Sequence, residues 1–92
     1  FESEYKGLKC ICSNMPQGYS EFFDSLENIQ DYDFMVNFFM NKQNRWNLSF
    51  YSDKENIDVS KIAAEFGGGG HLHAAGASKL PELPAFLRRK HD

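Results

Sequence analysis

Four consecutive glycines, Gly67–Gly70, directly follow a segment with the pattern of an amphipathic helix. Asp58 is placed to cap that helix, whose apolar stripe is formed by Val59, Ile62, Ala63 and Phe66. One glycine is enough to end a helix in the left-handed conformation, and each further glycine costs conformational entropy on folding. The remaining three therefore indicate backbone that approaches another group closely or adopts dihedral angles that other residues avoid.

His71 comes immediately after this run. Successive backbone N–H groups can surround a phosphate or another anion, and an imidazole beside them can donate to the same group. If that imidazole is protonated, its hydrogen bond to phosphate is worth about 1.5–3 kcal/mol. The sequence therefore predicts an anion site formed by Gly68, Gly69, Gly70 and His71. The alternative is a flexible glycine tether with two solvated histidines, His71 and His73.

Hydrophobic periodicity divides the 92 residues into the elements of one domain. Apolar patterns predict strands over 5–14, 33–40, 45–52 and 76–80. Helical spacing predicts helices over 19–26 and 58–66, and a last helix opened by Pro81 and Pro84. Strand 33–40 is apolar enough to be buried on both faces, and residues 41–44 have the length of a hairpin loop. The expected fold class is α/β: a small single domain, residues 1–92, with a mixed β-sheet of about four to five strands flanked by about three helices.

Cys10 and Cys12 are the only cysteines, and their spacing is poor for a disulfide between them. We expect two buried free thiols on one face of a strand, which favours a cytoplasmic location. His71 and His73 would need Cys10, Cys12 or His91 to complete a zinc site. We therefore expect no metal site in this chain.

Charge and hydropathy limit the kinds of partner that the chain can have. No apolar run approaches the roughly 18 residues of a membrane span, so we expect no membrane contact. The chain has no signal peptide and does not begin with Met, which indicates a fragment or a processed start. Residues 1–40 hold two basic and seven acidic residues, a balance of −5, whereas residues 41–92 hold eight and six, a balance of +2. An anionic ligand would meet the second half, unless this difference is ordinary surface scatter.

The segment IDVSKIAAEFGGGGHLHAAGAS, residues 57–78, resembles the signature of the DHH-associated domain type 1, the C-terminal domain of DHH-superfamily phosphoesterases. WNLSFYS, residues 46–52, resembles the strand that precedes this signature in the family. The earlier elements fit in order and length, though not by motif. The resemblance therefore covers the whole chain in layout and about a third of it in sequence.

This resemblance implies the hydrolysis of phosphodiester or phosphoanhydride bonds in short oligonucleotides, single strands, cyclic dinucleotides or related nucleotides. In such enzymes an N-terminal DHH domain holds two Mn²⁺ or Mg²⁺ ions and performs the reaction. This chain has no Asp-His-His sequence, so it would be the substrate-binding half, without catalytic residues and inactive alone. Its expected partners are the N-terminal DHH domain of the same chain and a short single-stranded nucleic acid or nucleotide, and a homodimer is left open.

Residue by residue, the resemblance assigns the terminal phosphate and sugar of the substrate to Gly68, Gly69, Gly70 and His71. Ser49 and Ser52 match hydroxyl positions on the preceding strand, and Tyr51 stands where many relatives have Arg. Tyrosine can stack on a base or donate one hydrogen bond, but it brings no charge. A mononucleotide-like or different phosphoester is therefore an alternative to a longer oligonucleotide, and an ordinary surface tyrosine is the simplest interpretation.

Two other functions are consistent with the same residues. One is a nucleic-acid-binding module without hydrolysis, such as the related domain that helps alanyl-tRNA synthetases hold tRNA. The other is a structural or oligomerisation domain in which the glycine run is only a turn.

Overall fold

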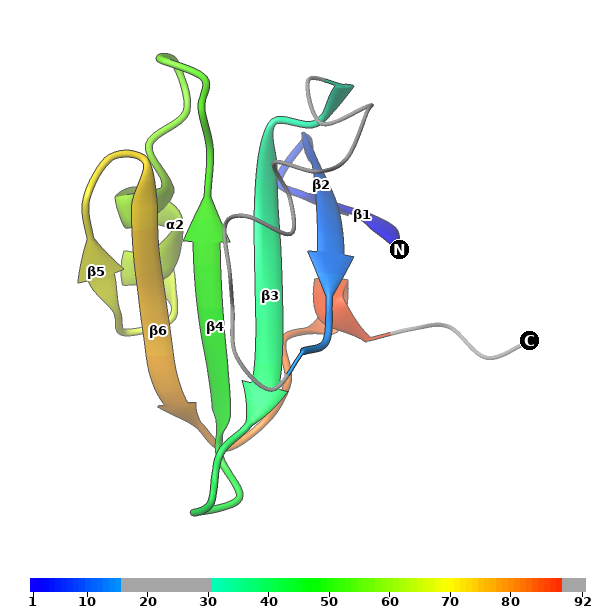
Figure 1. Cartoon of the computed structure of the whole chain (residues 1–92), viewed down its shortest axis with the longest axis vertical. Helices are drawn as coiled ribbons and strands as arrows, with labels where there is room; N and C mark the ends of the chain where they lie inside the picture. Colours follow the sequence, from blue (N-terminus) through cyan, green and yellow to red (C-terminus); the bar gives the residue numbers. More distant parts are fainter. Residues whose placement is uncertain (16–30, 89–92) are drawn as a thin grey trace.

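The computed structural model describes residues 1–15 and 31–88. In this part of the chain, six strands form one mixed sheet in the order β1-β2-β3-β4-β6-β5 (Figure 1). The strands are β1 Glu2–Tyr5, β2 Leu8–Ser13, β3 Phe34–Met40, β4 Trp46–Tyr51, β5 Gly69–Gly70 and β6 Ala74–Leu80. Only β2 and β3 pair in parallel, and the other neighbours are antiparallel. The mixed sheet was expected, but it has more strands than the four to five predicted.

The helices differ more from the prediction. Within the described residues, the only α-helix is α2, Val59–Glu65, and the predicted helix over 19–26 lies outside them. The predicted last helix is a single 3-10 turn, η2, Ala85–Leu87. Pro84 disfavours a helical backbone at Leu83, and Arg88 is already extended, so only one turn fits between them. The expected arrangement of about three flanking helices is therefore wrong for the described chain.

The predicted strand 5–14 is confirmed over Leu8–Ser13, which forms β2, but it starts later than predicted because residues 6 and 7 form a tight turn after β1. Lys6 and Gly7 have φ angles of 50° and 83°, the left-handed conformation that a two-residue hairpin turn requires. This turn reverses the chain and pairs Tyr5 with Leu8. A hairpin replaces the single strand at that edge of the sheet.

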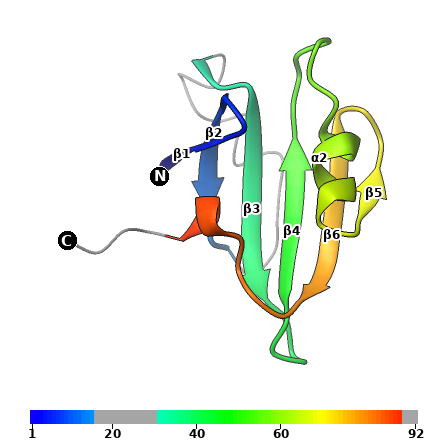
Figure 2. The ribbon, with the colours of Figure 1, turned by 180° about the vertical axis from the view of Figure 1, so that it is seen from behind.

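Helix α2 forms where its signals predict it. The Asp58 Oδ1 atom accepts a hydrogen bond from the Ser60 N–H at 3.0 Å, which caps the first turn. Gly67 follows the helix with a φ of 82°, as expected of the residue that ends it. Figure 2 shows α2 in front of one face of the sheet, close to β4, β5 and β6.

The core lies on this face of the sheet, beneath α2 and η2. It contains Cys10, Cys12, Phe34, Val36, Phe38, Leu48, Phe50, Ile57, Val59, Ile62, Ala63 and Leu87. The two thiols are free and buried on one face of β2, as predicted, with 3.8 Å between their sulfur atoms. Their mutual hydrogen bond and then burial raise the pKa of the Cys10 thiol.

The opposite face of the sheet is buried at β3, which confirms a strand covered on both sides. Met35 and Asn37 are only 4% and 1% exposed. The Asn37 side chain accepts hydrogen bonds from the Ser13 hydroxyl and the Met15 N–H, and donates to the Met15 carbonyl. A buried amide thereby ties the end of β2 to the centre of the sheet. Among the described residues, no helix has the length and apolar character needed to cross a bilayer.

Candidate functional site

The glycine run forms the end of a helix and an edge strand. The N–H groups of Gly67 and Gly68 donate to the Ala64 and Ala63 carbonyls at 3.1 and 2.9 Å. The strand β5 then pairs with β6, and the His71 N–H donates to the Ala74 carbonyl at 2.8 Å. An ordered backbone of this kind excludes the flexible tether.

Most N–H groups of the run already have partners. In an antiparallel ladder, pairs that exchange backbone hydrogen bonds alternate with pairs that do not. His71 and Ala74 form a hydrogen-bonded pair, so the next hydrogen-bonded pair along the hairpin is Gly69 with Gly76. Gly70 lies between them, and its N–H is directed away from β6 at the edge of the sheet. The expectation of several free N–H groups is therefore wrong, and the outward N–H belongs to Gly70, the residue before His71.

Steric contacts explain why two of these four positions are glycine. A Cβ atom on Gly68 would lie 2.0 Å from the Gly76 carbonyl oxygen, and one on Gly70 would lie 2.6 Å from the Ala75 Cα. Gly70 also has a φ of 147°. A Cβ on Gly69 would meet nothing within 4 Å. Close packing of β5 against β6 therefore accounts for Gly68 and Gly70 but not for Gly69.

The strand register brings the predicted residues of β4 and of the glycine hairpin together. Ser49 lies opposite Gly76, which lies opposite Gly69. Tyr51 lies opposite Ala74, whose other neighbour is His71. Opposite residues in an antiparallel pair share a face, so both rows lie on the face away from α2. With neighbouring strands roughly 5 Å apart, the Tyr51 and His71 backbones flank Ala74 at a separation of about 10 Å.

The surface between these residues is low and accessible. Gly69, Gly70, His71 and Ala74 are exposed, and Tyr51 is half-buried. Glycine and alanine leave a flat floor, while an imidazole and a phenol stand on either side of it. This arrangement leaves the exposed backbone of the hairpin and the His71 side chain accessible to a planar or tetrahedral group.

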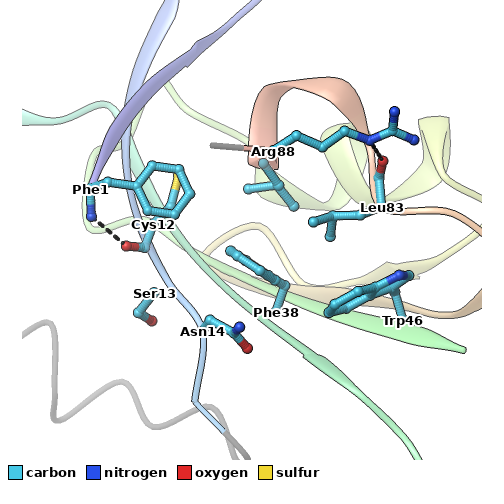
Figure 3. Close-up of a pocket in the computed structure, with 9 residues that line it drawn as sticks. Phe1, Cys12, Ser13, Asn14, Phe38, Trp46, Leu83 and Arg88 are labelled. Carbon is cyan, nitrogen blue, oxygen red and sulfur yellow. Dashed lines mark hydrogen bonds between the residues drawn. The ribbon is translucent and has the colours of Figure 1, made fainter. Parts of the chain in front are cut away.

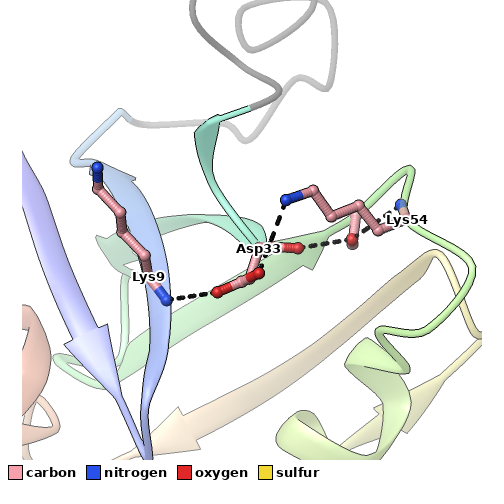
Figure 4. Close-up of polar contacts among 4 residues, drawn as sticks. Lys9, Asp33 and Lys54 are labelled. Carbon is pink, nitrogen blue, oxygen red and sulfur yellow. Dashed lines mark hydrogen bonds and ion pairs between the residues drawn. The ribbon is translucent and has the colours of Figure 1, made fainter.

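Ser52, another predicted site residue, does not lie on this surface. It is only 2% exposed, its hydroxyl donates to the Asp33 carbonyl at 2.7 Å, and it accepts from the Lys54 N–H at 3.2 Å. Asp33 in turn accepts from the Lys9 N–H at 2.8 Å and pairs with the Lys54 ammonium at 3.6 Å (Figure 4). The geometry gives Ser52 a role in joining β4 to β3, and a substrate contact through it stays a prediction.

A pocket of about 290 Å³ adjoins the glycine hairpin and contains two of the predicted residues, Ser49 and Gly68. Its wall also includes Gly76, Phe39, Asn47 and Ser78. None of these four was among the predicted site residues. The alternation of strand 45–52 places Asn47 on the same face as Ser49, and this signal could have identified it.

A larger pocket of about 560 Å³ has a different lining. Phe1, Phe38, Trp46 and Leu83 form much of its apolar wall, and Arg88 lies at one side (Figure 3). The Arg88 Nε donates to the Leu83 carbonyl at 2.8 Å. None of the predicted site residues lines this pocket.

Within residues 1–15 and 31–88, no three His, Cys, Asp or Glu side chains gather as metal ligands. Cys10 and Cys12 are buried in the core, whereas His71 and His73 are exposed on the hairpin.

Together the mixed sheet, the capped helix and the glycine hairpin form a small domain with a pocket of about 290 Å³ beside the hairpin. The family model of the DHHA1 domain, the DHH-associated domain type 1, matches residues 13–90. The chain belongs to this family. No curated protein matches it.

Two solved structures are similar to this chain. One is an uncharacterized protein from Helicobacter pylori G27, with 28% sequence identity and a TM-score of 0.66, over 83% of this chain and 21% of that protein. The other is PggH, a pGpG-specific phosphodiesterase from Vibrio cholerae, with 12% identity and a TM-score of 0.51, over 86% of this chain and 29% of that protein. At that identity the second likeness shows the fold alone. The chain spans less than a third of the length of either protein.

Proposed function

We propose that this chain is the substrate-binding domain of a metal-dependent DHH-family phosphoesterase and holds the phosphate and sugar end of a nucleotide or short oligonucleotide. The observation that carries the proposal is the register that places Tyr51 and His71 on either side of Ala74 on an accessible face. The two metal ions and the residues that hydrolyse the substrate would belong to an N-terminal DHH domain. This chain alone would bind without hydrolysis.

Each group at the site has a defined chemistry. The His71 imidazole and the outward Gly70 N–H can both donate to phosphate oxygens, and the Ser49 hydroxyl can bind a sugar hydroxyl. The Tyr51 side chain brings no charge, and its ring can contact a base. With a phenol in place of a guanidinium, the site supplies little positive charge, which favours a ligand with few phosphates.

This proposal can be tested by titrating the chain with adenosine 5′-monophosphate, with the dinucleotide pApA and with unphosphorylated adenosine. We expect millimolar binding of the two phosphorylated probes and weaker binding of adenosine. Replacing His71 with alanine should weaken phosphate binding about tenfold, because a charge-assisted hydrogen bond of about 1.5 kcal/mol is lost.

Lys42→Ala is the matched control, because it removes an exposed cation from the loop beyond the other end of β4. Its affinity for the phosphorylated probes should equal that of the wild type. Equal affinity for adenosine and its monophosphate would contradict the proposal, as would an unchanged affinity in His71→Ala.

A further inference from the structure

The turn that carries His71 is fastened to the rest of the domain by its two central residues. The Leu72 carbonyl accepts from the Val59 N–H at 3.0 Å, at the start of α2. The His73 carbonyl accepts from the Ser52 N–H at 3.1 Å, at the end of β4. The turn therefore bridges a helix and a strand rather than extending freely into solvent.

The His73 side chain adds a second hydrogen bond to the same partner. Its Nδ1 atom lies 2.8 Å from the Ser52 carbonyl oxygen. Because a carbonyl oxygen only accepts, Nδ1 must carry the proton in this contact. His73 and Ser52 are thus joined by two hydrogen bonds, one through each backbone carbonyl.

The strand register explains what this imidazole replaces. Phe50 pairs with Ala75 and Tyr51 with Ala74, so Ser52 faces His73 at the next position. In a regular ladder a bonded pair exchanges two backbone hydrogen bonds. Here the Ser52 N–H supplies one, and the His73 Nδ1–H supplies the donor for the other where the chain enters the turn.

Ser52, the partner of His73 in this contact, is itself held by a hydrogen bond. Its hydroxyl donates to the Asp33 carbonyl at 2.7 Å, and the Asp33 carboxylate accepts from the Lys9 N–H of β2 at 2.8 Å (Figure 4). A hydrogen-bonded path therefore runs from the turn through Ser52 and Asp33 to β2. A turn held in this way has a defined position relative to Tyr51, the residue before Ser52.

We propose that His73 is a positioning residue: its Nδ1–H bond to the Ser52 carbonyl fixes the turn that places His71 across Ala74 from Tyr51. This inference rests on the proposed function for its effect on ligand binding, although its effect on the turn is independent of any ligand. His73 itself need not touch the nucleotide.

Three substitutions at position 73 test whether the turn is held by the hydrogen-bond donor or only by the presence of a side chain. Asparagine has a side-chain N–H₂ on Cγ, the atom to which Nδ1 is attached in histidine, so His73→Asn retains a donor at the same place. His73→Gln moves the donor one bond further out, and His73→Ala removes it. Two readouts follow each variant: hydrogen exchange of the Ser52 and His71 N–H groups, and affinity for adenosine 5′-monophosphate.

We expect His73→Ala to speed exchange at Ser52 and His71 and to weaken binding, each by about two- to tenfold, as the loss of one neutral hydrogen bond predicts. His73→Asn should restore both values, and His73→Gln should not. Exchange in the β2–β3 ladder should stay unchanged in all three variants, which shows that the domain remains folded.

Wild-type exchange and affinity in His73→Ala would overturn the inference, and so would an asparagine variant no better than the alanine variant. If the wild-type chain does not bind the nucleotide at all, the proposed function fails instead. The exchange measurements then still decide whether His73 holds the turn.

Discussion

The two edges of the sheet are each closed by a hairpin with a two-residue turn, but the two hairpins are built from different side chains. In β1–β2, the Tyr5 ring lies 5.6 Å from Phe66 and 4.8 Å from Phe86, and its hydroxyl donates to Glu65 at 2.7 Å. Lys6 pairs with the same Glu65 carboxylate. In β5–β6, glycine and alanine occupy every paired position of β5 and its neighbours in β6.

This difference shows what each edge contributes. Large side chains fasten β1–β2 to α2 and η2, so that edge serves stability. The β5–β6 edge is held by backbone contacts, which leaves its surface low and an imidazole exposed at its tip. An edge made in this way can receive a ligand without first displacing a bulky side chain.

The largest difference in stability is expected when one methyl group is added at different positions of the glycine run. Gly68→Ala should lower the free energy of unfolding by about 2–3 kcal/mol, because the new Cβ would overlap the Gly76 carbonyl. Gly69→Ala should change it by less than about 1 kcal/mol, since its Cβ meets open space. Urea unfolding of the two variants measures both values. Similar losses in both would show that β5 is not packed on β6 as described.

A smaller effect on the free energy of unfolding is expected from the β1–β2 hairpin in alkaline solution. Burial and the hydrogen bond to Glu65 raise the pKa of Tyr5 from 10.0 to about 12. The folded state therefore holds this proton more tightly than the unfolded state. The resulting stability is complete below pH 10 and is lost as the pH rises to about 12.

Tyr5→Phe retains the ring contacts and removes the ionising group, so it isolates this contribution. The free energy of unfolding of the wild type should fall more steeply over this pH range than that of the variant. Parallel curves from the two proteins would show that the Tyr5–Glu65 contact does not contribute to the stability of this edge.

Local signals were sufficient to predict part of the fold. The Asp58 cap and Gly67 define both ends of α2, and alternation in strand 45–52 separates the core residues Leu48 and Phe50 from Ser49 and Tyr51. The β1–β2 turn was missed because lysine rarely adopts the φ of 50° seen at Lys6. Strand β5 was missed because Gly69 and Gly70 have no side chains from which a period can be read.

The residues of the candidate site could be named from the sequence, but their arrangement could not. The glycine run and His71 stand out in the sequence, and the family match agrees with the signature they carry. Which N–H groups are occupied, and why Ser52 is buried, depends on the long-range pairing of β4, β5 and β6. Such register is set by packing across the whole sheet, and no local pattern encodes it.

We propose that a nucleotide phosphate binds at the accessible face between Tyr51 and His71. The most direct test of this claim is a map of backbone amide shifts as adenosine 5′-monophosphate is added to the chain. We predict the largest shifts at Gly69, Gly70, His71 and Tyr51. Shifts centred instead on Phe38 and Trp46, in the larger pocket, or no selective shifts at millimolar nucleotide, would contradict the claim.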